Sequence, residues 1–271
     1  MHVAVFVLVR VSFSRFIRHT LDTRLSKFHR YHSYNPEVKR RISTQPSTLL
    51  VRPLLIYYAL PLLKTFVGVI STQPDAILRW SPEDVERLDL ERVVAVFASM
   101  YLFDIAHHQS TLPYFIHHLV SLAFALATIT LGRGPSQVIM SLFFAPFLAP
   151  GMAFGDTCGE ASWLAYRLAP YRRSGQASVY GALLAACARV HAAARLLLWA
   201  LIARYLWCFS AQVAAAAGVR AVPALAAALA YWGWCEWFYV RLGFRLQEKW
   251  EKESADCARM LAVRCPAKGM I

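Results

Sequence analysis

Six long apolar stretches constrain the fold of this chain more than any other feature of its sequence. A helix needs about 20 predominantly apolar residues to cross about 30 Å of hydrocarbon. Six segments approach that length, at roughly 49–70, 92–108, 113–131, 136–154, 178–204 and 222–244. The composition agrees, because only 17% of the residues are charged against about 25% in soluble domains. The sequence therefore predicts an all-α, polytopic membrane helix bundle with about six transmembrane helices.

Basic residues gather near the two ends of the chain and set its predicted topology. Nine Lys and Arg fall in residues 1–47 and seven in residues 241–271. Cytosolic segments of membrane proteins carry an excess of Lys and Arg, so both termini are predicted to be cytosolic and the 71–91 loop lumenal. The same rule accounts for the net charge of +13. With no nucleic-acid-binding motif in the sequence, we expect no nucleic-acid partner.

This charge pattern divides the chain into three regions. Residues 1–47 form a basic N-terminal region, residues 48–247 a transmembrane domain, and residues 248–271 a basic cytosolic tail. An interfacial helix is predicted near the N-terminus. Its apolar side would hold Phe6, Val9, Phe13, Phe16 and Ile17, and its polar side Arg10, Ser14 and Arg18.

Ionisable side chains at the second and third apolar segments mark a candidate site, because charge within a membrane is costly and usually functional. Asp104 lies near the end of one segment, and His117 and His118 open the next. The short linker between the two segments predicts an antiparallel hairpin that brings the three side chains together. A histidine beside a carboxylate can act as a general base, so these residues are predicted to be catalytic. Alternatively, the histidines lie at the membrane interface and only bind headgroups or loops.

Arginines within the fifth segment predict a polar wall inside the bundle. Arg189 and Arg195 should face a cavity and pair with a carboxylate such as Glu160 or Glu236. Their alternative role is a structural ion pair. The fourth segment contains Pro146 and Pro150-Gly151 and should kink.

A metal site is not expected. The nine histidines lack the clustered spacing of membrane di-iron enzymes, and four of them lie in the N-terminal region. The sequence therefore predicts no metal and no bound cofactor.

The order of these motifs resembles the TLC domain, the family of translocation-associated membrane proteins, longevity-assurance ceramide synthases and a ceroid-lipofuscinosis protein. The resemblance covers roughly residues 48–247. The residues that carry it are Tyr101-x-x-Asp104, His117-His118, Glu160-x-Ser162, Arg167, Arg189, and the aromatic set Trp234, Trp237 and Phe238. It implies an endoplasmic-reticulum membrane protein whose helices surround a lipid-accessible cavity, with Glu160, Ser162, Arg189 and Arg195 on its wall.

The resemblance also implies a function in membrane lipid homeostasis, through lipid sensing, binding or trafficking. Its partners would be membrane lipids, with a homo-oligomer as a further expectation. Ceramide synthases of the family carry a His-Asp downstream of the His-His pair, and this sequence has none after His117-His118. The chain therefore looks like the non-synthase branch. The alternative function is a ceramide-synthase-like N-acyltransferase, with a sphingoid base as acceptor and acyl-CoA as co-substrate.

Overall fold

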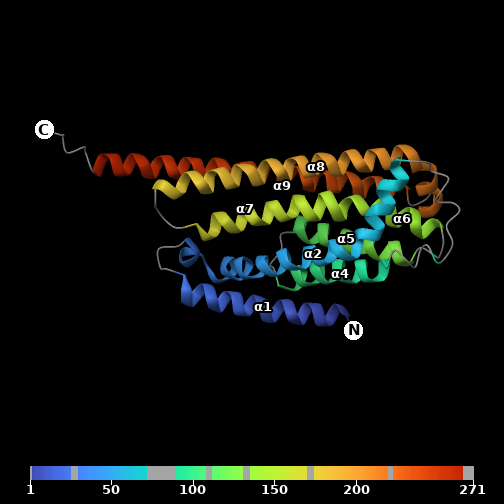
Figure 1. Ribbon diagram of the computed structural model, residues 1–271, viewed down its shortest axis with the longest axis horizontal. Coiled ribbons are helices and arrows are strands. Elements are labelled where there is room, and N and C mark those ends of the chain that lie inside the picture. The colour runs from blue at the N-terminus through green and yellow to red at the C-terminus, as the bar shows by residue number, and fades with distance from the viewer. Residues whose placement is uncertain are drawn as a thin grey trace.

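Long helices that run back and forth along one axis make up the structure, a computed structural model that describes residues 2–25, 30–71, 83, 89–107, 112–130, 135–169, 174–218 and 222–264. Within these ranges the structure contains no β-strand, so the all-α class is confirmed. Figure 1 shows the arrangement. The elements are α1 (His2–Arg24), the 3₁₀ helix η1 (Arg30–Ser33), α2 (Pro36–Ser71), α4 (Leu90–His107), α5 (Leu112–Thr130), α6 (Pro135–Pro146), the π-helix η3 (Phe147–Asp156), α7 (Thr157–Leu168), α8 (Ser174–Ala217) and α9 (Val222–Arg264).

Two helices among the described residues are long and apolar enough to cross a membrane. They are Pro36–Ser71 and Val179–Ala215, identified by length and composition, so the predicted bundle of six spans is not confirmed. Shorter apolar helices run over Phe115–Thr130 and Gln137–Pro146. The predicted lumenal loop 71–91 falls mostly outside the described residues.

The structure buries charged and polar side chains beside its apolar core and also exposes many large apolar ones. Large apolar residues point outward on several helices, among them Leu50, Val67, Leu119, Leu196 and Trp207. Arginines, acids and histidines lie inside, among them Arg52, His118, His191 and Glu236. The exterior thus carries many large apolar side chains, and the interior contains charged groups as well as an apolar core.

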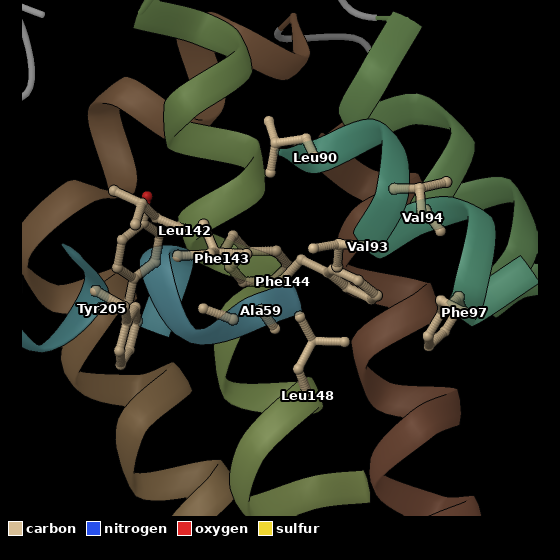
Figure 2. Close-up of a cluster of buried hydrophobic side chains, with 14 of the residues drawn as sticks. Ala59, Leu90, Val93, Val94, Phe97, Leu142, Phe143, Phe144, Leu148 and Tyr205 are labelled. Atoms are coloured by element: carbon tan, nitrogen blue, oxygen red, sulfur yellow. The ribbon is translucent and has the colours of Figure 1, made fainter. Parts of the chain in front are cut away.

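Aromatic and aliphatic side chains from α2, α4, α6 and α8 pack into the main apolar core (Figure 2). Phe97 of α4 meets Phe144 of α6 edge to face, with ring centroids 4.9 Å apart. The Tyr205 hydroxyl of α8 donates a hydrogen bond to the Ile139 carbonyl of α6 at 2.7 Å, which pairs its polar group inside the core. This core fixes the four helices against one another at one end of the cavity described below.

The chain from α6 to α7 forms one continuous helix with a π-helical turn in its middle. Thr157, where α7 begins, keeps helical dihedral angles (φ −60°, ψ −46°). Pro150 has no N–H to bond the carbonyl four residues earlier, and the helix widens over Phe147–Asp156. The predicted kink is thus a π-helical segment, a feature that often occurs at functional sites.

The N-terminal helix α1 has its polar side buried, which corrects the prediction of a helix with that side exposed. It packs along α2 and α4 (Figure 1). Arg10 is only 2% exposed and Ser14 is also buried, whereas Leu8 and Phe16 point outward. Because α2 and α4 present hydroxyl and carbonyl groups to it, Arg10 finds its partners inside the bundle.

The predicted domain boundaries fall inside helices. Residue 47 lies within α2, and residue 247 lies within α9, which continues to Arg264. The extension of α9 is held by packing, because Trp250 contacts Tyr166 of α7 and Tyr180 of α8. A basic tail that begins at residue 248 therefore starts as a continuation of the bundle.

Candidate functional site

A cavity of about 620 Å³ lies between six helical elements. Its volume is in the range of pockets that hold a small molecule or a lipid headgroup. The lining residues that carry the argument are Arg41, Arg52, Tyr101, Asp104, Pro113, His117, His118, Asp156, Glu160, Ser162, Trp163, Arg167, His191, Trp234, Phe238 and Tyr239. They come from α2, α4, α5, the continuous helix η3–α7, α8 and α9, so the site exists only in the assembled bundle.

Asp104 and His118 meet at one wall of the cavity, as the helical hairpin predicted. His118 Nε2 lies 3.6 Å from Asp104 Oδ2. The other carboxylate oxygen lies 3.6 Å from Nη2 of Arg10, which reaches it from α1. His117 packs edge to face against His118, with ring centroids 5.6 Å apart. Asp104 thus lies between a guanidinium and an imidazole, both nearly buried.

Arg10 is held by a set of contacts that fix α1 to the bundle. Its Nη1 donates to the Met100 carbonyl at 3.2 Å, and its Nη2 donates to the Thr48 hydroxyl at 2.5 Å. The guanidinium also stacks 3.9 Å from the centroid of the Phe103 ring. Arg10 therefore connects α1, α2 and α4 at the back of the Asp104 wall.

A second ion pair closes the wall between α2 and α7. Arg52 Nη2 donates to Glu160 Oε1 at 2.5 Å, and Arg52 Nη1 lies 3.4 Å from the Thr157 hydroxyl. The Arg52 side chain is 5% exposed, so the charge is removed from water and needs this partner. The arginine that interrupts the first apolar segment is thus part of the cavity.

Arg195 of α8 holds two carboxylates at once. It pairs with Asp156 of η3, and its Nε lies 2.6 Å from Glu236 Oε2 of α9. Asp156 lines the cavity, whereas Arg195 and Glu236 stand behind it. One buried guanidinium therefore ties three elements together and fixes the carboxylate that faces the cavity.

His191 sits one turn before Arg195 and contacts the π-helix. Its Nδ1 lies 2.6 Å from the Gly155 carbonyl. A carbonyl only accepts hydrogen bonds, so Nδ1 carries the proton. His191 approaches this closely because Gly159 has no side chain, and a Cβ there would lie 3.1 Å from Nδ1. The glycines of this helix make room for the polar side chains of α8.

Gly159→Ala is expected to destabilise the protein by about 1–2 kcal/mol, because the new methyl group displaces His191 from Gly155. Gly68→Ala in α2 is the matched control, since a Cβ there meets no atom within 4 Å. The control should be neutral or stabilising by up to about 1 kcal/mol. Thermal unfolding in detergent measures both, and equal behaviour of the two variants would contradict the close approach.

The structure brings together most, but not all, of the predicted site residues. Asp104, His117, His118, Glu160 and Ser162 line the cavity. The Ser162 hydroxyl donates to the Gly159 carbonyl at 2.7 Å, one turn earlier in its own helix. The predicted catalytic roles stay predictions.

Arg195 and Arg189 correct the prediction for α8. Arg195 supports the cavity from behind rather than lining it, and Arg189 is exposed on the outer face of the helix. Successive helical residues are turned by about 100°, so Arg189 cannot share the inward face of Ala188, His191 and Arg195. Hydropathy alone placed both arginines inside, but only the helical phase distinguishes them.

Three important residues were missed from the predicted site, namely Arg10, Arg52 and Asp156. The sequence placed Arg10 on the polar side of an interfacial helix, and Arg52 lies within the first apolar segment without a predicted role. Asp156 follows a glycine within an apolar run, and its charge inside such a run is a signal of function. A charged side chain alone in an apolar segment, with residues of opposite charge elsewhere in the chain, is the signal that indicates all three.

Aromatic side chains of α9 form another part of the cavity lining. Trp234, Phe238 and Tyr239 line the cavity, and Trp234 and Phe238 are also 54% and 49% exposed at the outer surface. Pro113 of α5 is likewise exposed and lines the cavity, and its carbonyl accepts a hydrogen bond from the Tyr231 hydroxyl of α9 at 2.6 Å. Exposed apolar side chains of α9 therefore form part of the cavity lining, next to the contact between α5 and α9.

Comparisons with known proteins do not place the chain in a family: no family model, no curated protein and no solved structure matches it. Among the described residues, no group of three or more His, Cys, Asp or Glu side chains is arranged to hold a metal ion. The geometry of the cavity therefore carries the functional argument.

Proposed function

We propose that this chain is a multi-pass membrane protein of the TLC type that binds a membrane lipid in its cavity and acts in membrane lipid homeostasis. The observation that carries the proposal is a cavity lined both by charged side chains and by the aromatic side chains of α9, of which Trp234 and Phe238 are exposed. A polar headgroup fits the charged wall, and acyl chains fit the exit beside Trp234 and Phe238. The resemblance in motif order supports the same family.

Six membrane spans would account for the exposed large apolar side chains and the buried charged ones. The spans would use the apolar parts of α2, α4, α5, α6–η3, α8 and α9. Arg189 of α8 and Arg241 and Arg245 of α9 are exposed, and the two helices touch at Ala188 and Gly243 nearby. Exposed arginines at one level fit a membrane–water interface, where the side chain extends to the headgroups. We place this level on the cytosolic side of an endoplasmic-reticulum membrane, with both termini in the cytosol.

This level puts the cavity within reach of the cytosolic leaflet. His191 follows Arg189 by two residues on α8 and packs against Gly159, the neighbour of Glu160 on α7, and Glu160 pairs with Arg52. A headgroup at the interface can therefore enter sideways without crossing the hydrocarbon. This geometry suits a lipid sensor or carrier, which must bind and release its ligand from the bilayer.

The second candidate function is an N-acyltransferase that uses acyl-CoA and a sphingoid base. The observation that favours it is the contact of His118 with Asp104, since a carboxylate-paired imidazole suits a general base. In that reaction the amine would attack the thioester carbonyl while His118 takes its proton, and the C–S bond would break to release the coenzyme A thiol as the amide forms. The absence of a downstream His-Asp weighs against it.

Lipid analysis of cells that express the wild type or the His117→Ala/His118→Ala variant tests the two functions. The control is His19→Ala, an exposed histidine of α1. We expect the wild type and the control to change membrane lipid composition and the double variant to lose at least half of that change. Purified wild type should transfer no acyl group from acyl-CoA to a sphingoid base. Transfer that the double variant lacks would favour the enzyme, and unaltered lipids in all strains would contradict the proposal.

A further inference from the structure

The inner end of the cavity carries more carboxylates than guanidiniums. Among the described residues there, four acids face three arginines: Asp104, Asp156, Glu160 and Glu236 against Arg10, Arg52 and Arg195. All three arginines are already engaged with these acids. An excess negative charge away from water is costly unless a cation or a proton neutralises it. This end therefore favours a positively charged ligand group.

The outer end of the same cavity has the opposite sign. Arg167 lines it, stacks 4.7 Å from the Trp163 ring centroid, and has no carboxylate partner among the described residues. Arg41 lines it too, although Glu37 already pairs with it at 3.3 Å. Arg167 follows Glu160 by seven residues on α7, which is two turns or about 10 Å along the same face. A cationic and an anionic group thus lie on the same cavity, two helical turns apart on one face of α7, and the long Arg167 side chain spans part of that separation.

Hydrogen-bond acceptors without a donor indicate whether the bound cation carries N–H groups. His191 lines the cavity and is 6% exposed, and its Nε2 has no hydrogen-bond partner among the described residues. Because Nδ1 carries the proton, Nε2 of the neutral ring offers a lone pair. Glu160 Oε2 is a second buried acceptor without a partner within the described structure. Both atoms can accept a hydrogen bond from an N–H group, which a positive charge without N–H groups cannot donate.

We propose that the cavity binds the headgroup of an aminophospholipid, with the primary ammonium at Asp156, Glu160 and His191 and the phosphate at Arg167. The acyl chains leave between α5 and α9, past Trp234 and Phe238. A primary ammonium supplies one positive charge and three N–H donors, whereas a quaternary ammonium supplies the charge and no donor. The site therefore selects ethanolamine over choline headgroups. This inference rests on the proposed lipid-binding function and names its ligand.

The test measures lipid retention by the full chain in detergent, using native mass spectrometry and an equimolar mixture of lipids with identical acyl chains. The lipids are phosphatidylethanolamine, its N,N-dimethyl form and phosphatidylcholine, which carry three, one and no N–H donors at constant charge. We expect retention to fall along this series, by about tenfold from first to last, since a charge-assisted hydrogen bond contributes roughly that factor.

Variants of this chain locate the two ends of the ligand. Glu160→Gln should reduce the preference for the primary amine, and Arg167→Gln should weaken all three phospholipids alike. Arg189→Gln, on the outer face of α8, should change neither. The comparison of the three lipids on wild-type protein tests the preference for a primary amine by itself. That test therefore remains valid if Glu160→Gln does not fold. Excess water-soluble phosphoethanolamine should compete only weakly, as the chains contribute to binding.

Three outcomes would overturn the inference. Equal retention of all three lipids would remove the amine assignment and leave the lipid-binding function intact. Stronger binding of water-soluble phosphoethanolamine than of the lipid would show that the ligand is a free phosphoamine. Absence of saturable retention of any lipid would contradict both the inference and the proposed function.

Discussion

Arg195→Met is expected to destabilise the protein by about 3–5 kcal/mol, because it leaves the buried Glu236 carboxylate and the half-buried Asp156 carboxylate without their partner. Arg195 is only 6% exposed, so water cannot replace the lost guanidinium. The variant should be recovered at low yield and should unfold far below the wild type on heating in detergent. Thermal unfolding followed by tryptophan fluorescence measures the effect.

Two further variants make the result specific. Arg189→Met changes an exposed arginine six positions earlier on the same helix, and its effect should stay below about 0.5 kcal/mol. Combining Arg195→Met with Asp156→Asn and Glu236→Gln neutralises the cluster, and most of the lost stability should return. Equal loss in the Arg189 and Arg195 variants would mean that the arrangement of α8 given above is wrong.

Arg10→Met is expected to release α1 from the bundle. The substitution removes the hydrogen bonds to Thr48 and the Met100 carbonyl and the ion pair with Asp104. Hydrogen bonds to a charged group contribute about 1.5–3 kcal/mol each, so we expect a loss of roughly 3–5 kcal/mol. Limited proteolysis in detergent should cleave α1 many times faster than in the wild type.

Arg15→Met is the matched control for this prediction, since Arg15 lies on the exposed face of the same helix. It should leave the proteolysis rate and the unfolding temperature nearly unchanged. If Arg10→Met behaves like this control, α1 does not depend on its polar side, and the simple interfacial helix predicted from the sequence is the better description.

Apolar length and charge predicted where the helices lie, because burial of apolar residues in lipid or core leaves a clear pattern in composition. Each predicted apolar segment coincides with a helix of the structure. The polar continuations of these helices past their apolar segments were not predicted. For example, α9 continues to Arg264, where Trp250 packs against α7 and α8. Such extensions depend on contacts between helices, and a single sequence does not display them.

The sequence predicts contacts within the site where a short linker forces two helices to lie side by side. The short link between α4 and α5 brought Asp104 to His118, and this contact could be inferred before the fold was known. The pairing of Arg52 with Glu160 joins positions 108 residues apart, which only the assembled bundle reveals. The prediction that Arg189 faces the cavity was wrong, because composition indicates which segment is apolar and does not indicate which side of the helix a residue occupies. The π-helical segment determines the direction in which Asp156 points. Periodicity of 3.6 residues does not predict such a segment.

Lipid photo-crosslinking tests the central claim most directly, namely that the cavity holds a membrane lipid. Wild-type protein in nanodiscs would receive a trace of phospholipid with a diazirine in its acyl chain, and cross-linked peptides would be mapped with and without excess unlabelled lipid. The account predicts saturable labelling at the α9 wall, around Trp234 to Tyr239, and weaker, non-saturable labelling of exposed residues such as Leu196. Labelling spread evenly over the apolar exterior, with no saturable component at α9, would contradict it.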